Sequence, residues 1–411
     1  MSIKTNKDRL WNNLMEMAKI GATEKGGSCR LALTTEDKAG RDLFVKWCKA
    51  AGCSLSVDNM GNMFFRRAGS DPDAPPIAMG SHLDTQPHGG KFDGVYGVLA
   101  GLEVVCTLND NHIGTCAPIE IIVWTNEEGS RFAPAMLASS VFAGVFDLEY
   151  GLSRKDKAGI TVESALQSIG YAGDMVCGEH MLGAFFEAHI EQGPLLEEEG
   201  KTIGVVEGAQ GTRWYDVMVK GTDAHAGSTP MKGRRDALVG AARIIDGLHN
   251  IALSHGPDAV ATVGELTVSP NSRNTIPGEV LFSVDIRHHS EHMLKELDRV
   301  FQTQCHTTAN TMGLEVEITD VWYQPPVLFN ETCVNAVEQA ASELMLPFRT
   351  IFSGAGHDAC LVSRVAPTGM IFVPCEGGIS HNEAENANAD DLAAGCDVLF
   401  NAVLSQAGIG N

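Results

Sequence analysis

The sequence lacks three features that would each point to a particular class of protein. No apolar run approaches the roughly 18 residues needed to span a bilayer, and the first 22 residues contain no apolar core of the kind found in secretory signals. The eleven cysteines form an odd set without a Cys-x-x-Cys pair, which fits neither a disulfide framework nor a thiolate zinc site. We therefore expect a soluble cytoplasmic protein with reduced thiols.

Positive charge is also scarce. The chain has 30 Lys and Arg against 52 Asp and Glu, a formal net charge of −22. A surface this negative repels phosphate backbones and anionic lipid headgroups. Nucleic acids and membrane surfaces are therefore not expected as partners.

The chain does have the length and composition of a folded protein with more than one domain. Its 411 residues correspond to about two or three domains at roughly 150 residues each. The hydrophobic content of 44% and the charged content of 20% lie close to the globular average. Disordered, collagen-like and coiled-coil classes are excluded.

The first part of the chain alternates strand and helix signals. A helix is predicted over residues 34–51, a buried strand ending at His82, a helix over 95–108 and a strand over 119–124. Polar residues follow each predicted strand. This order predicts an α/β fold, and such folds bind ligands at the carboxyl ends of their strands.

A different pattern fills residues 212–326. Strands are predicted at 214–220, 261–268, 279–287 and 314–319, with helices over 236–253 and 290–312. This β-α-β-β-α-β order is ferredoxin-like. We therefore expect a first domain of residues 1–211 and 327–411 with an inserted α+β domain of residues 212–326.

Five polar clusters lie at predicted strand ends or loops of the first domain. Alone, each has an ordinary explanation, because a His at a strand end is usually just hydrogen-bonded and paired glutamates usually face solvent. Together they supply the imidazoles and carboxylates that a two-metal site needs. Asp84 is expected to orient the His82 imidazole, since side chains at i and i+2 share one side of an extended chain. The clusters are His82-Leu83-Asp84, Phe92-Asp93-Gly94, Glu127-Glu128-Gly129, His189-Ile190-Glu191-Gln192-Gly193 and Ser380-His381-Asn382.

The order of these motifs resembles the amidase, hydantoinase/carbamoylase family, a group of dinuclear metallopeptidase-like hydrolases. The resemblance covers nearly the whole chain. It implies a metallopeptidase-like catalytic domain, in which helices flank a mixed sheet, plus an inserted ferredoxin-like lid and dimerisation domain.

The resemblance also implies roles for the clustered residues. Two divalent metal ions would be held, zinc or else manganese, cobalt or nickel. Asp93 would bridge them, His82 and His189 would hold one ion, and Glu128 and His381 the other. Glu127 would be the general base, since a base must reach the attacking water while a ligand stays fixed.

A second set of residues is implied to contact a substrate that carries a carboxylate and a ureido group. Arg287 would bind the carboxylate, because its planar fork suits two-pronged contact. His225 would act across a homodimer interface to polarise the scissile carbonyl. The other positions that match substrate contacts are Gln192, Asn274 and Gly356, while His357 and Asp358 have an equally good interpretation as residues that only shape the pocket.

The predicted activity is hydrolysis of the carbamoyl C–N bond of N-carbamoyl amino acids, as in N-carbamoyl-L-amino-acid hydrolases and β-ureidopropionases of the family. Allantoate amidohydrolysis is the main alternative, because it uses the same metal site and carboxylate clamp. A dipeptidase or aminopeptidase, or a binding protein without catalysis, are weaker alternatives.

Overall fold

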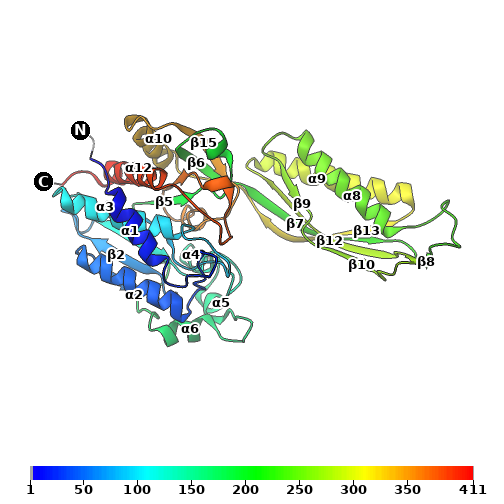
Figure 1. Ribbon diagram of the computed structural model, residues 1–411, viewed down its shortest axis with the longest axis horizontal. Helices are drawn as coiled ribbons and strands as arrows, with labels where there is room; N and C mark the ends of the chain where they lie inside the picture. The colour runs from blue at the N-terminus through cyan, green and yellow to red at the C-terminus, as the bar shows by residue number, and fades with distance from the viewer. Residues whose placement is uncertain (1–2, 411) are drawn as a thin grey trace. The chain divides into compact units, whose positions relative to one another are not determined.

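The computed structural model describes residues 3–410 and divides into two compact units (Figure 1). One unit comprises Met1–Glu207 and Leu328–Asn411, and the other comprises Gly208–Val327. The boundaries predicted from the sequence were 211/212 and 326/327. Within the described residues, no helix is both long enough and apolar enough to cross a membrane.

The first unit contains a sheet flanked by helices. Its helices are α1 (Lys7–Met17), α2 (Thr35–Ala50), α3 (Val95–Asp110), α4 (Leu137–Phe142), α5 (Leu148–Ser153), α6 (Val162–Ile169), α7 (Leu195–Glu198), α10 (Glu331–Glu343), α11 (Asp358–Val362), α12 (Ala389–Ala407) and the 3-10 turn η1 (Glu376–Gly378). Its strands are β1 (Ser54–Val57), β2 (Met63–Arg67), β3 (Ile77–His82), β4 (Ile119–Trp124), β5 (Ala184–Ile190), β6 (Ile203–Ala209), β14 (Val327–Leu328), β15 (Phe348–Ser353) and β16 (Thr368–Val373). The predicted mixed sheet between helices is confirmed.

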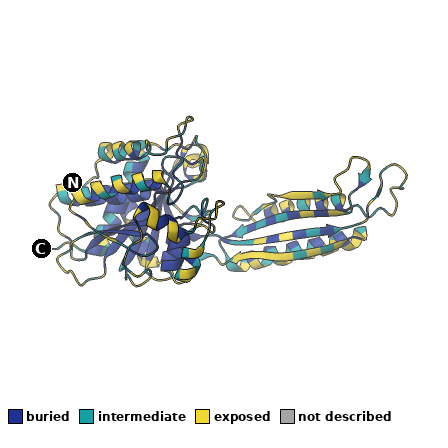
Figure 2. Cartoon of the chain, turned by 90° about the horizontal axis from the view of Figure 1, so that it is seen from below, coloured by how far each residue is buried: buried dark blue, intermediate teal, exposed yellow. Residues whose placement is uncertain are grey.

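The strand order in this sheet is β1-β2-β4-β3-β5-β16-β6-β14, and β15 pairs with β6. The four central strands β4, β3, β5 and β16 are parallel, whereas β2 and β6 pair antiparallel to them. Every residue of these four strands is buried, as the dark blue ribbon of Figure 2 illustrates. Their carboxyl ends therefore meet at one edge of a rigid sheet.

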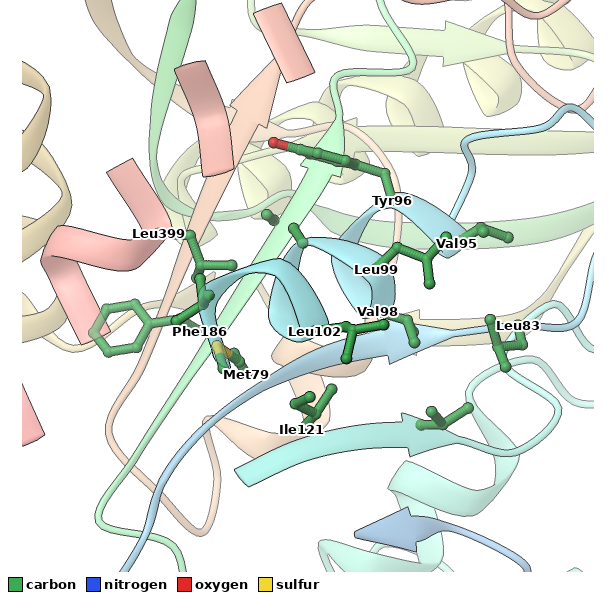
Figure 3. Packing of buried hydrophobic residues seen from close by; sticks show 14 of the residues in the cluster. Met79, Leu83, Val95, Tyr96, Val98, Leu99, Leu102, Ile121, Phe186 and Leu399 are labelled. Carbon is green, nitrogen blue, oxygen red and sulfur yellow. The ribbon is translucent and has the colours of Figure 1, made fainter. Parts of the chain in front are cut away.

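Helix α3 is apolar on nearly all sides, which is typical of a helix buried all round. Figure 3 shows Tyr96, Leu99 and Leu102 of this helix within the cluster that also holds Met79 of β3 and Phe186 of β5. Gly97 permits the close approach, because a Cβ there would lie 2.4 Å from the Ala188 carbonyl oxygen. This core fixes the loop that precedes α3.

Helix α2 begins as its sequence predicts. Thr34 is the N-cap, and its side chain accepts a hydrogen bond from the Asp37 amide. Asp37 and Arg41 are fully buried on this helix, although charged residues normally lie at the surface.

The second unit has the predicted ferredoxin-like order. Its elements are β7 (Gly211–Lys220), β8 (Ala224–His225), α8 (Ala237–Ser254), β9 (Val260–Thr262), β10 (Leu266–Ser269), β11 (Thr275–Ile276), β12 (Glu279–His288), α9 (Glu291–Met312) and β13 (Glu315–Gln324). The main sheet runs β10-β12-β7-β13, and α8 and α9 lie side by side against it. Alternate residues of β12 are buried, as its sequence pattern predicts.

One predicted strand is interrupted. The run 261–268 forms two short strands, β9 and β10, that both pair with β12. Between them the Ser283 hydroxyl accepts a hydrogen bond from the Glu265 amide, and the Ser283 amide donates to the Glu265 carbonyl. Gly264 lies in this break, where a residue without a side chain permits an irregular backbone.

Candidate metal centre

The carboxyl ends of the parallel strands bring together polar clusters that are far apart in the sequence. His82 is the last residue of β3, Glu127 and Glu128 follow β4 closely, and His189 lies near the end of β5. Because these strands are parallel neighbours, their ends meet at the same edge.

Asp93 lies at the middle of this group, in the loop before α3. Its Oδ1 is 3.2 Å from Nε2 of His189 and 3.9 Å from Nε2 of His82. Its Oδ2 is 3.3 Å from Nε2 of His381, which in turn lies 3.4 Å from Oε2 of Glu128. The two carboxylate oxygens thus face different pairs of ligand-type side chains.

These contacts define two groups with the geometry of metal sites. One is His82, Asp93 and His189, all buried, and the other is Asp93, Glu128 and His381. Asp93 belongs to both. Together they are the five residues that the sequence predicts as ligands.

The two buried imidazoles have the tautomer that a metal ligand requires. Nδ1 of His82 is 2.8 Å from the Asp84 carbonyl oxygen, and Nδ1 of His189 is 2.9 Å from that of Ile190. A carbonyl can only accept, so Nδ1 carries a proton and Nε2 is the ring nitrogen that can bind a cation, with the Gly94 amide 3.2 Å from Nε2 of His189. Gly94 follows Asp93, and a Cβ there would lie 2.3 Å from the His82 ring. The donor set fits a divalent metal pair.

The backbone turns sharply around the adjacent glutamates. Asn126 has φ of 57° and Gly129 has φ of 64°, both left-handed. The Asp84 carboxylate accepts hydrogen bonds from the Glu127 and Glu128 amides at 3.3 and 3.2 Å. Oε2 of Glu127 then lies 3.5 Å from Nε2 of His82, while Glu128 faces His381. The two glutamates therefore face different partners.

The predicted role of the Asp84 carboxylate is wrong in detail. His82 contacts the main-chain carbonyl of Asp84. The Asp84 carboxylate instead accepts hydrogen bonds from the amides of the loop after β4. The i and i+2 argument assumes that the strand continues, but β3 ends at His82. The side chain of Asp84 consequently points to another strand end.

Burial and neighbouring charges shift the pKa values of these carboxyl groups in different directions. Burial, together with the surrounding carboxylates, raises the pKa of Glu127 well above its usual range. Burial and the charge of Asp93 raise the pKa of Glu128 to about 8. Burial also opposes ionisation of Asp93, yet hydrogen bonds from His189 and His381 hold its pKa well below its usual range. Asp93 is thus the carboxylate that stays ionised, and Glu127 readily takes a proton.

We expect the metal-free protein to lose stability as pH rises from 6.5 to 9. Contact with Asp93 overcomes burial to raise the pKa of His189 from 6.5 to about 9, so its contribution is lost across this range. Burial raises the pKa of Asp84 and of Glu385 to about 7, so their contributions are lost mainly below pH 7. A raised pKa means that the folded state binds protons more tightly than the unfolded chain, so rising pH favours unfolding. His82 titrates below this window, since burial lowers its pKa to about 4.

The measurement is the melting temperature of chelator-treated protein across that pH range. A parallel series with divalent metal is the control, and it should depend less on pH because metal binding displaces these protons. A melting temperature that increases with pH in the metal-free series would contradict the expectation.

Two supporting residues, Gln86 and Glu385, were not predicted from the sequence. Gln86 donates to Oε2 of Glu128 at 2.6 Å. Glu385 accepts the Asp93 amide at 3.1 Å and the Ser380 hydroxyl at 3.0 Å. A Cβ at Gly90 would lie 2.0 Å from the Glu385 carboxylate, so this glycine was the one available signal. Nothing in the spacing of the sequence relates residue 385 to residue 93.

The other predicted positions of the first unit divide into two sorts. Gln192 donates to Oδ2 of Asp93 at 3.2 Å, so it lies at the centre. Gly356 is exposed. His357 is buried against the His189 ring, with 4.5 Å between the centroids, and Asp358 accepts the Ser139 hydroxyl. His357 and Asp358 are thus buried beside the centre, where His357 also groups with Glu187 and His189, and both interpretations of them stay predictions.

The remaining predicted residues belong to the second unit. His225 on β8 pairs with Thr275 on β11, which places Asn274 beside it. Nδ1 of His225 accepts hydrogen bonds from two backbone amides at 3.1 Å, so Nε2 carries the proton of the neutral ring. Arg287 on β12 donates to both oxygens of Asp285. His225 is exposed and can act as an imidazole donor.

Comparison with known proteins identifies the class of this fold and site. Residues 78–405 match the model of peptidase family M20/M25/M40. The chain belongs to this family. The predicted recognition and fold are confirmed, and the chain is a hydrolase of this group.

Individual relatives of this chain have more specific names than the family. The chain is 50% identical over 406 residues to the N-carbamoyl-L-amino-acid amidohydrolase of Rhizobium meliloti, covering 99% of this chain and 98% of the relative. It is 34% identical to the allantoate amidohydrolase of Bacillus subtilis, covering 96% of both chains. The crystal structure of an amidase of the hydantoinase/carbamoylase family from Burkholderia multivorans matches with a TM-score of 0.96 and 58% identity, over 98% of each chain.

Proposed function

We propose that this protein hydrolyses the carbamoyl C–N bond of N-carbamoyl amino acids. The reaction consumes water and yields the amino acid, carbon dioxide and ammonia. The observation that carries the proposal is the carboxylate of Asp93, whose two oxygens face two separate sets of ligands, with Glu127 beside one of them. The similarity to N-carbamoyl-L-amino-acid amidohydrolases over nearly the whole chain supports this substrate class.

The proposed centre holds two divalent metal ions, zinc or else manganese, cobalt or nickel, since imidazole and carboxylate ligands accept all of these. Bound ions supply Lewis-acid chemistry that makes water nucleophilic near neutral pH. Asp93 would bridge them, His82 and His189 would hold one, and Glu128 and His381 the other. Asp84 and Glu385 support this set through the backbone amides that they bind.

Glu127 is the proposed general base. It takes a proton from the attacking water and passes it to the leaving nitrogen, so one carboxylate serves both halves of the reaction. Burial raises its pKa, and a carboxylate that binds a proton more tightly is a stronger proton acceptor.

The proposed substrate clamp uses Arg287 for the carboxylate, assisted by Gln192, Asn274 and Gly356. We expect Arg287→Lys to raise KM sharply for carboxylate-bearing substrates, because an ammonium keeps the charge and loses the two-pronged contact. Asp285→Asn is the matched control, since it disrupts the Arg287–Asp285 pair and retains the guanidinium. Steady-state kinetics measure both variants. An unchanged kcat/KM for Arg287→Lys would place the carboxylate elsewhere.

We also propose a homodimer in which His225 of each chain serves the active site of the other. The Nε2 proton of this exposed ring suits a donor to the developing oxyanion, and such a donor acts mainly in the transition state. Mixing inactive His225→Ala with inactive Glu127→Gln protein should restore activity, because one site of the heterodimer receives both intact residues. Native mass spectrometry verifies subunit exchange. Heterodimers without activity would remove His225 from this role.

The experiment that tests the function measures ammonia release from a panel of N-carbamoyl amino acids and from allantoate, and release of free amino acids from dipeptides. Turnover of N-carbamoyl amino acids in preference to the others supports the proposal. Allantoate is the second candidate, because the chain is also 34% identical to an allantoate amidohydrolase. Release of ammonia from allantoate alone would replace the proposed substrate, cleavage of dipeptides would indicate a peptidase, and inactivity on all would indicate a binding protein. We propose the cytoplasm as its location, since the eleven cysteines are free thiols.

A further inference from the structure

Arg30 is a buried cation whose contacts are unusual. Its side chain is 1% exposed, and its hydrogen bonds go to uncharged oxygens. Nε donates to the Leu83 carbonyl at 2.7 Å, and Nη1 donates to the Ile20 carbonyl at 2.8 Å. Burying a charge costs free energy unless the site compensates it. The free energy cost of burying Arg30 therefore raises the question of which segments its hydrogen bonds keep in place.

Nearby carboxylates supply the compensation. Burial lowers the pKa of Arg30 to about 10, and Asp37 and Asp84 partly offset this by favouring its charged form. Burial likewise raises the pKa of Asp84, and Arg41 opposes that change. All four groups are buried. Two arginines and two aspartates thus lie buried near one another, with a direct contact between Arg41 and Asp37.

The Leu83 carbonyl is the point at which Arg30 meets the metal centre. This carbonyl belongs to the peptide that joins Leu83 to Asp84. The carbonyl of Asp84 fixes Nδ1 of His82, and its carboxylate holds the amides of Glu127 and Glu128. The backbone of Arg30 holds the next residue, because its amide donates to the Thr85 hydroxyl at 2.8 Å and its carbonyl accepts the Thr85 amide at 3.0 Å.

Arg41 acts similarly at the neighbouring strand. Its Nη2 donates to the Thr125 hydroxyl at 3.1 Å, directly after β4. Its Nε donates to Asp37 at 2.9 Å, and Nη1 donates to the Gly61 carbonyl at 2.8 Å. Each arginine therefore secures the segment that follows one of the two central strands β3 and β4.

We propose that Arg30, with Arg41 beside it, is a positioning residue that sets the orientation of His82 and of the Glu127–Glu128 turn for metal binding. The inference rests on the metal centre of the proposed function. A guanidinium is needed because its planar fork reaches carbonyls on separate segments, which one ammonium cannot do in the same geometry. Groups that orient metal ligands commonly contribute tenfold to a hundredfold to metal affinity.

The test is zinc affinity of Arg30→Lys, measured by competition with a chromogenic chelator at a temperature where the metal-free variant is folded. We expect binding to weaken by about 10- to 100-fold. The matched control is Arg67→Lys. Arg67 also donates to a carbonyl, that of Ile113, but it pairs with Ile119 at the opposite end of β4. Both variants should lower the melting temperature of the metal-free protein, and only Arg30→Lys should lower zinc affinity.

Wild-type zinc affinity in Arg30→Lys would overturn the proposal and leave Arg30 a purely structural residue. If that variant does not fold, Thr85→Val keeps the shape and removes the hydroxyl that accepts the Arg30 amide and donates to the Ser28 and Gln86 carbonyls at the same junction. Weaker zinc binding by Thr85→Val supports the proposal, and unchanged binding overturns it. The two proposals can fail separately. If Arg30→Lys loses zinc affinity but the wild-type protein does not hydrolyse N-carbamoyl amino acids, the proposed substrate is rejected and the positioning role of Arg30 is retained. A wild-type chain that binds no zinc would reject both.

Discussion

Replacing Glu127 with glutamine is expected to lower kcat by at least about 10²-fold, since a positioned acid–base group commonly contributes 10²- to 10⁴-fold. Glutamine keeps the size of the side chain and cannot accept or return the proton. The amides of residues 127 and 128 stay bonded to Asp84, so the turn should persist. Metal content should remain that of the wild-type protein. Steady-state rates and elemental analysis of the same sample measure the two quantities.

Glu128→Gln is the matched control for this variant. It makes the same chemical change one residue away, at a side chain that faces His381 instead of His82. We expect it to lose metal as well as activity, because a neutral amide is a poorer ligand than a carboxylate. Near-normal turnover by Glu127→Gln would remove Glu127 from its role as the base.

Removal of metal is expected to abolish hydrolysis, and addition of a divalent metal to restore it. The reason is that a bound divalent ion lowers the pKa of water to about 7, which Glu127 alone cannot do. Activity is assayed after dialysis against a chelator and again during titration with zinc, manganese, cobalt or nickel. Two ions per chain at full activity is the expected stoichiometry.

A control for this experiment is circular dichroism of the metal-free protein, which must show that the chain remains folded. Asp93→Asn offers a second route to the same question, because it weakens the one carboxylate shared by both groups of ligands. Undiminished turnover in metal-free, folded protein would contradict a metal-dependent mechanism and the proposed function with it.

Much of the site could be predicted because parallel strands bring their ends together. His82, Glu127 and His189 each lie at or closely after a strand whose apolar residues are recognisable in the sequence. Once the strands are parallel neighbours, these polar ends must meet. Asp93 and His381 lie in loops, where the sequence showed only polar clusters, and the family resemblance was needed to assign a metal-binding role to each of the five residues.

The predicted interruption-free strand at 261–268 shows where sequence patterns fail. Local apolar content favoured one strand, but the pairing of both halves with β12 and the Ser283 contact with Glu265 decided the break. The paired residues of β12 lie outside the short stretch of sequence that a local pattern covers. Local propensity does not contain information about such a contact.

The sequence by itself determined the order of elements, the two-part organisation and the residue types at the strand ends, because periodicity and turn residues act locally. Only the tertiary structure decided which atoms of those residues form hydrogen bonds, and with which partners. The Asp84 carboxylate turns to the amides of Glu127 and Glu128, and Arg30 reaches the Leu83 carbonyl. These are contacts between segments separated by more than 40 residues. They form because a buried polar group must find a partner wherever the folded chain provides one.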